Sequence, residues 1–165
     1  MAADLIMDIK IEGLDGLLDR MKKFPKEMAV RGGPIRAALA AGGKIVREEA
    51  KANVRKIIQE PNKGGLDSAS TGLLEKNIIQ KRHRDPKKRD PKASEIYSVR
   101  VRRKKTGKGV DITRYAKILE FGSEHISAKA WLRNAAASKR QEAIQVIAKK
   151  LAQGIAKIER KLGGK

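Results

Sequence analysis

The stretch Tyr115–Ser123 reads YAKILEFGS and combines a short helical pattern with an abrupt stop. Its first seven residues fit a short helix, and Gly122 stands in the usual terminating position because glycine adopts positive φ at no steric cost. Leu119 and Phe121 are expected to pack this helix against a sheet. Glu120 lies between them, either as an exposed residue or as a buried partner for arginine or backbone N–H groups, with an intersubunit salt bridge as a further reading. The stretch is therefore predicted to be a structural turn.

A long helix is predicted after this turn, over about residues 129–162. Its apolar residues step alternately by four and three, which is the spacing of a heptad seam. The seam packs either on the chain's own sheet or helix, or on a neighbouring subunit. Its members are Ile144, Ala148, Leu151, Ile155, Ile158 and Leu162.

A second long helix is predicted in the N-terminal half. Its apolar stripe consists of Ile35, Leu39, Val46, Ala50, Val54 and Ile57. Proline disfavours helical geometry in the residue before it, so a kink is expected near Gly33-Pro34. An interior glycine costs about 1 kcal/mol relative to alanine, and a close helix–helix approach at Gly42-Gly43 would explain that pair.

Alternation of apolar and polar residues predicts strands at Met7–Ile11 and Tyr97–Val101, and Asn77–Arg82 has the character of a third. A short amphipathic helix is predicted through Leu14–Met21. The stretch Gln59–Ser70 is rich in Gly, Pro, Asn and Ser and is predicted to be a loop. Ser70 or Thr71 is then expected to cap a helical turn through Leu73-Leu74.

The composition fits one domain over residues 1–165, with no internal repeat. Only 3% of the residues are aromatic, so the core must consist of Ile, Leu, Val, Met and Ala. Cysteine is absent, which excludes disulfides and thiolate metal sites. No apolar run approaches the roughly 18 residues that cross a bilayer, and the N-terminus does not resemble a signal peptide.

The net charge of +20 predicts a polyanionic partner. Residues 81–108 hold thirteen basic and three acidic residues, which is half of the excess. Two basic loops, at about 81–95 and 103–113, are expected to contact DNA phosphates or an acidic protein surface, or else to be plain solvated loops. The candidate contact residues are Lys81, Arg82, Arg84, Lys87, Lys88, Arg89, Lys92, Arg102, Arg103, Lys104, Lys105 and Lys108.

Sequence-specific recognition of a nucleic acid is not indicated. No helix-turn-helix, zinc or basic-zipper pattern is present. The basic loops contain no aromatic residue on which a base would stack. Contact with nucleic acid would therefore be to the backbone, independent of sequence and strongly weakened by salt.

Catalysis and cofactor binding are not predicted either. The two histidines, His83 in the basic loop and His125 beside Glu124, have no matching cluster of metal ligands. No phosphate loop, dinucleotide fingerprint or nucleophile elbow occurs. The chain is therefore expected to be neither an enzyme nor a metalloprotein, and to carry no cofactor.

YAKILEFGS and the following AKAWLRNAAASK, Ala128–Lys139, resemble the tail-completion or neck family of long-tailed phages, the "gene product ten"-like family of lambdoid phages. That family typically shows a tyrosine, an aliphatic pair, Glu-Phe-Gly-Thr, a loop, and a Pro-Phe-Leu-Arg-like start to a last helix. It also shows a Thr-Gly-x-Leu element before a strand. The residues of this chain that match, and that are expected to be structural, are Thr71, Gly72, Leu73, Tyr115, Leu119, Glu120, Phe121, Gly122, Trp131 and Leu132.

This resemblance implies an α+β fold with a small antiparallel sheet flanked by helices, a long kinked helix in the N-terminal half and a long C-terminal helix. It implies a virion protein, made in the host cytoplasm, that forms a ring, a hexamer, at the head–tail junction. The ring would complete the tail, join it to the head and leave a channel for phage DNA. The implied partners are further copies of the chain, head-closure or adaptor proteins, and tail terminator or tail tube proteins, with no membrane.

Two alternatives remain open, a tail terminator ring protein and a basic non-specific DNA-binding protein. The chain also departs from the family pattern. Ala130 occupies the usual proline position, so the start of the last helix is expected to be less sharply defined. The basic stretch Lys81–Lys92 looks longer and more charged than usual, so its role cannot be taken from the family.

Overall fold

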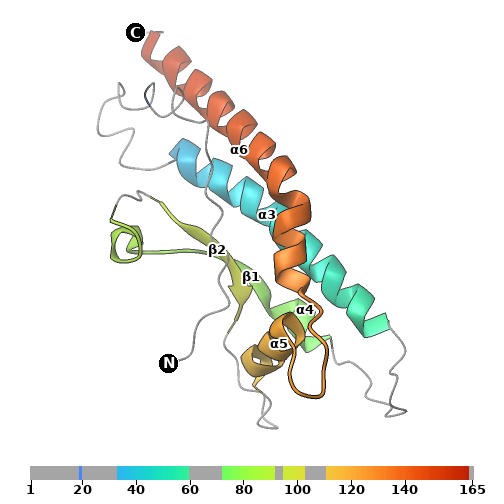
Figure 1. Ribbon diagram of the computed structural model, residues 1–165. Helices are drawn as coiled ribbons and strands as arrows, with labels where there is room; N and C mark the ends of the chain where they lie inside the picture. Colours follow the sequence, from blue (N-terminus) through green and yellow to red (C-terminus); the bar gives the residue numbers. More distant parts are fainter. Residues whose placement is uncertain (1–18, 20–32, 60–71, 92–94, 103–110, 164–165) are drawn as a thin grey trace.

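The computed structural model describes residues 19, 33–59, 72–91, 95–102 and 111–163 (Figure 1). Its elements are α3 (Gly33–Gln59), α4 (Leu73–Asn77), β1 (Ile78–Arg82), the short 3-10 helix η1 (Pro86–Lys88), β2 (Tyr97–Val101), α5 (Ile112–Phe121) and α6 (Trp131–Gly163). The α+β class is confirmed, with long helices in the N-terminal half and at the C-terminus and a two-stranded antiparallel sheet. The predicted strand Met7–Ile11, the helix through Leu14–Met21, residues 60–70 of the predicted loop and the basic residues 103–110 lie outside the described residues.

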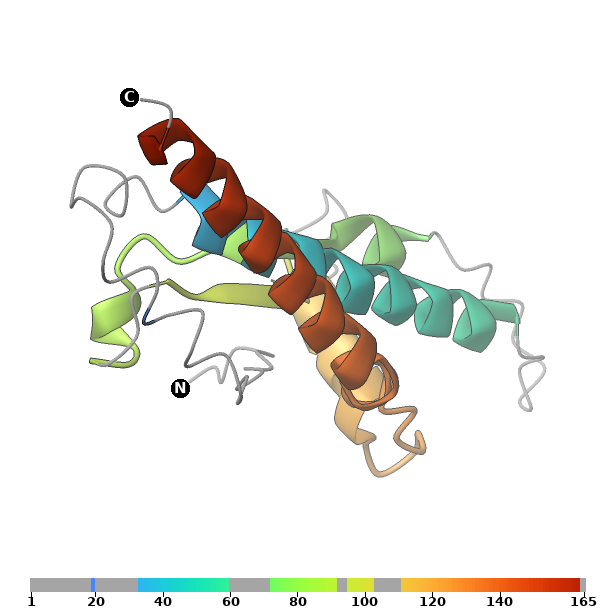
Figure 2. The same cartoon turned by 90° about the horizontal axis from the view of Figure 1, so that it is seen from above.

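The two long helices pack against each other in antiparallel directions (Figures 1 and 2). Near the start of α3, Pro34 meets Gly154 of α6. In the middle of the pair, Gly42 meets Ile147. Towards the end of α3, Asn53 Nδ2 donates to Trp131 O at the start of α6, at 3.0 Å. The helices therefore contact each other along most of the length of α3.

The predicted stripe on α3 is confirmed. Val46, Ala50 and Val54 are buried, and Ile35, Leu39 and Ile57 pack against the core partly buried. Gly33 and Pro34 are the first two residues of the helix, so the described helix begins where the kink was predicted. Proline is tolerated there because the first turn has no intrahelical partner for its missing N–H.

The seam on α6 was predicted only in part. From Ala143 onwards the buried residues are Ala143, Ile147, Leu151 and Ile155, which step by four, and the side chain of Leu162 lies outside the described residues. Of the predicted members, Ile144, Ala148 and Ile158 are only half-buried. Because α6 crosses α3 at an angle in Figure 1, its contact line follows a row of every fourth residue and not a supercoiled seam.

The predicted close approach at Gly42-Gly43 is confirmed. A Cβ on Gly42 would overlap the Ile147 side chain and lie 3.2 Å from Ala143 O, both on α6. A Cβ on Gly43 would overlap the side chain of Gln80 on β1, whose Nε2 donates to Ala40 O at 3.0 Å. The glycine pair therefore lets α3 touch α6 on one side and the hairpin on the other.

We expect Gly42→Ala to be less stable than Gly33→Ala by about 1–3 kcal/mol, the usual cost of overpacking. Both variants replace a helical glycine, but a Cβ at Gly33 has no atom within 4 Å, so Gly33→Ala adds a methyl group without overpacking and serves as the control. Urea denaturation of both variants measures the difference. Equal stability would show that the two helices separate freely at this point.

The hairpin of β1 and β2 covers α3 on the side away from α6 (Figure 2). Its register pairs Ile78 with Val101 at one end and Arg82 with Tyr97 at the other. Ile78, Val99 and Val101 are buried in the larger of two apolar clusters, which also includes residues of α3, α4, α5 and α6. The smaller cluster contains Ala38, Ile147, Leu151 and Ile155, so among the described residues only α3 and α6 build it.

The N-cap position of α4 is occupied by Gly72, with φ +62°. Ser70 and Thr71, the predicted caps of this helical turn, lie outside the described residues. Glycine is suited to this position because the left-handed region costs it nothing. Among the described residues, no helix is long and apolar enough to span a membrane.

Candidate functional site

The family-like motif builds the junction between α5 and α6. Asp111 begins α5, its Oδ1 accepting from Thr113 N at 2.9 Å, so the helix starts three residues before the predicted Tyr115. Gly122 ends it with φ +82°, as predicted. A Cβ there would lie 2.9 Å from Ile126 O, so the following turn folds back tightly against the end of the helix.

Glu120 is the centre of this junction and is only 1% exposed. Its Oε2 accepts from Leu132 N at 2.7 Å, and its Oε1 accepts from Arg133 N at 3.0 Å and Arg133 Nε at 2.9 Å. Arg133 Nη2 also donates to Glu120 O at 2.8 Å. The carboxylate therefore caps the first turn of α6 and holds its arginine, which confirms the buried alternative. Both oxygens are engaged within the chain, which disfavours an intersubunit salt bridge.

Trp131 and Leu132 complete the junction from the α6 side. Trp131 is fully buried and its Nε1 donates to Ala116 O at 3.2 Å. Leu119 and Leu132 are buried beside it in the larger cluster. Ala130, in the usual proline position of the family, has φ +47°, which the proline ring forbids. This chain therefore starts α6 with a backbone conformation that a proline could not adopt.

The prediction that Phe121 packs in the core is wrong. Its side chain is 60% exposed, and its ring lies 5.1 Å from the Arg133 guanidinium carbon in a cation–π contact. Two residues along a helix amount to a rotation of about 200°, so Phe121 faces away from the buried Leu119. We use the name α5 apolar surface for the exposed large apolar side chains of α5 and of the turn after it, which are Tyr115, Phe121 and Ile126; among the residues whose burial the structure describes, no other large apolar side chain is exposed.

In the Thr-Gly-x-Leu element, Gly72 caps α4 and Leu73 packs partly buried against the larger cluster. Thr71 lies outside the described residues.

The candidate polyanion contacts are not brought together into one patch. The antiparallel hairpin places residues 83–91 at one end and Arg102 at the other. The exposed members are Lys81, Arg84, Lys87, Lys88, Arg89 and Arg102. Lys92, Arg103, Lys104, Lys105 and Lys108 lie outside the described residues.

Arg82 is held in an ion pair within the fold. Its Nε donates to Glu95 Oε2 at 2.6 Å and its Nη2 to Glu95 Oε1 at 2.8 Å, while Arg36 Nε of α3 donates to the same Oε1 at 2.7 Å. The Glu95 side chain is only 7% exposed. The hydrogen bonds from Arg82 and then Arg36 lower the pKa of Glu95, against the opposing effect of burial. The cluster fastens the hairpin to α3.

We expect Glu95→Gln to lower stability at pH 7 by roughly 1.5–3 kcal/mol, the usual contribution of a charge-assisted hydrogen bond. Because folding lowers the pKa of Glu95, its contribution is present above the ordinary value of about 4.3 and is lost as the pH falls through the folded value. Urea denaturation at pH 7 and pH 3 should therefore show that wild type and variant differ less in their free energy of unfolding at pH 3 than at pH 7. Glu124→Gln, on an exposed turn, is the control, and a gap that is independent of pH would contradict the prediction.

The histidines have no metal-site geometry. His83 Nε2 lies 2.9 Å from Ser98 Oγ, and His125 is exposed on the turn after α5. The described residues contain no group of three His, Cys, Asp or Glu side chains arranged to hold a metal ion.

Glu95 is a structural ion-pair residue that the sequence analysis did not single out. Its partners Arg82 and Arg36 lie 13 and 59 residues away along the chain, on β1 and α3. A charge of either sign on a helix or loop is too common in this chain for its spacing alone to reveal such a pair.

These contacts define a small α+β protein whose most distinctive motif is a junction between helices. The sequence profile of the family described as "Bacteriophage HK97-gp10, putative tail-component" matches residues 15–122. The chain belongs to this family. The match includes Thr71–Leu73 and Tyr115–Gly122 and ends before Trp131. No curated protein and no solved structure shows significant similarity to the chain.

Membership in a family of phage tail components implies a location in the virion and interaction with other phage structural proteins. It also favours a structural protein over an enzyme.

Proposed function

We propose that this protein is a ring-forming subunit at the head–tail interface of a long-tailed phage, where it completes the tail and joins it to the head around a channel for DNA. The observation that carries the proposal is the family match over residues 15–122. We also propose one domain for the whole chain, and further copies, head-closure or adaptor proteins and tail terminator or tail tube proteins as its partners.

The α5 apolar surface supports contact with another protein. Phe121 and Tyr115 are 60% and 48% exposed, and aromatic residues and arginine are enriched at the cores of protein interfaces. The Phe121 ring is already oriented by Arg133, which is itself held by Glu120. A partner that covers this surface would therefore restrict little side-chain freedom.

The charge supports a polyanion near the ring. Six copies would carry six times the net charge of +20 and would repel one another unless DNA or acidic neighbours offset it. The exposed cations of the hairpin ends, in the 81–108 region, are proposed to face either channel DNA or an acidic adjoining ring. Arg82 is left out of this surface because Glu95 holds it.

Negative-stain imaging of the purified full-length protein, alone and mixed with phage tails, tests the ring. Rings, or density added at the head-proximal end of tails, are expected. A protein that stays monomeric at tens of micromolar and leaves tails unchanged would contradict the proposal. Neutralising the six exposed cations (Lys81, Arg84, Lys87, Lys88, Arg89 and Arg102) to Gln should abolish joining of heads and tails while the monomer stays folded, and normal joining would contradict their role.

A further inference from the structure

Several arginines of the protein body are engaged by carboxylates of the same chain. Glu95 holds Arg36 and Arg82, Glu75 holds Arg55, Glu120 holds Arg133, and Glu48 holds Arg47. Near the start of α6, Lys139 is paired with Glu142. The charge of these cations is offset where they stand.

The C-terminal half of α6 is instead rich in cations without such a partner among the described residues. It carries five exposed cations and a single acid, Glu159, between residues 149 and 163. No carboxylate of the described residues lies within ion-pair distance of any of the five. We call these residues the α6 cationic face: Lys149, Lys150, Lys157, Arg160 and Lys161.

The face is concentrated along one side of the helix. Lys150, Lys157 and Lys161 recur at intervals of seven and four residues, which places them on one line along an α-helix. At 1.5 Å per residue they span about 16 Å. This length corresponds to about five base pairs of duplex DNA, at 3.4 Å per step.

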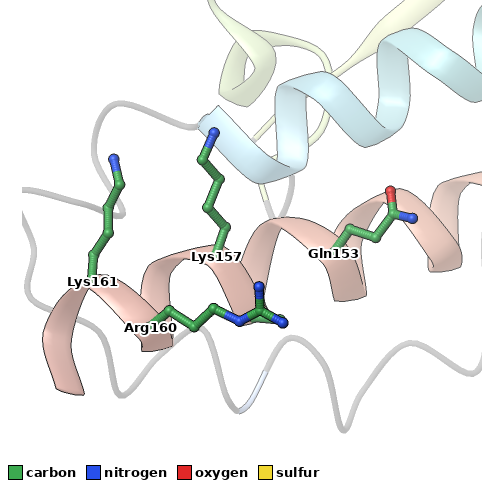
Figure 3. Close-up of a pocket in the computed structure, with 5 residues that line it drawn as sticks. Gln153, Lys157, Arg160 and Lys161 are labelled. Atoms are coloured by element: carbon green, nitrogen blue, oxygen red, sulfur yellow. The ribbon is translucent and has the colours of Figure 1, made fainter. Parts of the chain in front are cut away.

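A shallow open hollow lies within this face, lined by Gln153, Ala156, Lys157, Arg160 and Lys161 (Figure 3). Figure 3 shows Lys157 and Lys161 extending from the helix in the same direction, whereas Arg160 runs along the helix towards Gln153. The three cations and the amide therefore offer several hydrogen-bond donors around a small floor at Ala156. Such donors are suited to phosphate oxygens.

Electrostatic stabilisation of the helix end does not account for the whole face. Cations in the last turn interact favourably with the helix dipole, which covers Arg160 and Lys161. That effect falls off within one turn. Lys149, Lys150 and Lys157 lie further from the end at Gly163, so the helix dipole does not account for them.

The chemistry of the face favours a phosphate backbone over a protein. A protein interface needs apolar or aromatic anchors at its centre, and the exposed large apolar side chains among the residues whose burial is described belong to the α5 apolar surface instead. Backbone binding to DNA needs only positive charge and donors. We propose that the α6 cationic face binds the backbone of double-stranded DNA without regard to sequence. This inference rests on the proposed function and deepens it, because it adds a second surface of the subunit, apart from the hairpin cations, that binds the DNA.

The test measures binding of the full-length protein to a fluorescein-labelled 24-base-pair duplex by anisotropy, over a series of salt concentrations. The quadruple variant Lys149→Gln, Lys150→Gln, Lys157→Gln, Lys161→Gln is compared with a control that removes the same charge elsewhere. That control is Lys44→Gln, Lys56→Gln, Lys76→Gln, Arg114→Gln, four exposed cations on α3, α4 and α5. Circular dichroism melts confirm that both variants are folded.

The α6 variant should bind at least tenfold more weakly than wild type at about 0.1 M salt. The slope of its salt dependence should be shallower by roughly 0.9 for each DNA phosphate that the variant no longer neutralises. The control should bind less than threefold more weakly than wild type. Equal weakening in the two variants would show that net charge alone acts and would overturn the proposal. So would wild-type binding to poly-L-glutamate as tight as to DNA at the same salt, since an acidic protein would then fit the face.

The outcome is separable from that of the proposed function. DNA binding is measured on the soluble subunit, whereas imaging with tails reports on the ring. A subunit that forms rings but binds DNA equally well without the α6 cations refutes this inference alone. A subunit that binds DNA through α6 but never joins tails refutes the proposed function alone.

Discussion

Glu120→Ala should destabilise the protein by about 3–5 kcal/mol, the range for removing one partner of a buried charge pair. The variant loses the acceptor for Leu132 N, Arg133 N and Arg133 Nε together. Two backbone N–H groups in the first turn of α6 then lose the carboxylate that accepts their hydrogen bonds. The junction is buried, since Glu120 itself is only 1% exposed. Desolvated donors without partners cost far more than the net gain from making the bonds.

Urea denaturation of Glu120→Ala, Glu120→Gln and Glu124→Ala measures the effect. The glutamine variant keeps the shape and one acceptor oxygen, so it should lie between alanine and wild type. Glu124 is exposed on the adjacent turn, and its replacement should change stability by no more than about 0.5 kcal/mol. If Glu120→Ala were as stable as Glu124→Ala, the junction would not depend on the carboxylate.

Trp131→Ala is expected to cost about 3–5 kcal/mol, the usual range for truncating a fully buried aromatic residue. Trp131 is 0% exposed, and it sits where α5, α6 and the end of α3 meet. Trp131→Phe should cost less, because it keeps most of the apolar volume and removes chiefly the hydrogen bond from Nε1 to Ala116 O. Thermal or urea unfolding of the two variants gives the comparison.

Phe121→Ala is the matched control for that prediction. Both aromatic residues belong to the same motif, but Phe121 is exposed and contacts mainly Arg133. Its replacement should cost about 1 kcal/mol or less, in keeping with an exposed cation–π contact. Comparable destabilisation at Phe121 and Trp131 would mean that the Phe121 ring is covered in solution. Under the proposed function, Phe121→Ala should weaken binding to tails while leaving the fold intact.

The sequence predicted the elements that local periodicity determines. The stripe on α3, the hairpin strands and the extent of α6 follow from the spacing of apolar residues, and each is confirmed. The glycine pair at 42–43 was also anticipated, because two adjacent glycines inside a helix need a compensating close contact.

Features that depend on how elements meet were not predictable in the same way. The side on which Phe121 lies is set by which face of α5 meets the core, and two apolar neighbours at 119 and 121 cannot both face inwards on a helix. The register of α6 depends on its crossing angle with α3, which no local pattern encodes. The ion pair between Arg82 and Glu95 forms because the hairpin brings the residue before β2 next to the end of β1. The composition does not contain this pairing, so Arg82 was predicted to be an exposed cation.

The smaller cluster of Ala38, Ile147, Leu151 and Ile155 divides the molecule into parts of unequal resistance to opening. Among the described residues, the end of the α3–α6 pair that it holds has far fewer buried side chains than the junction around Trp131. Segments with few buried contacts open at low free energy, independently of global unfolding. Amide hydrogens of α6 near Ile155 should therefore exchange with solvent well before those near Leu132. Binding of DNA to this half of α6 would stabilise it against local opening and so slow the exchange of its amide hydrogens. Bound DNA would therefore have its largest effect on hydrogen exchange in the same half of the helix that opens at the lowest free energy.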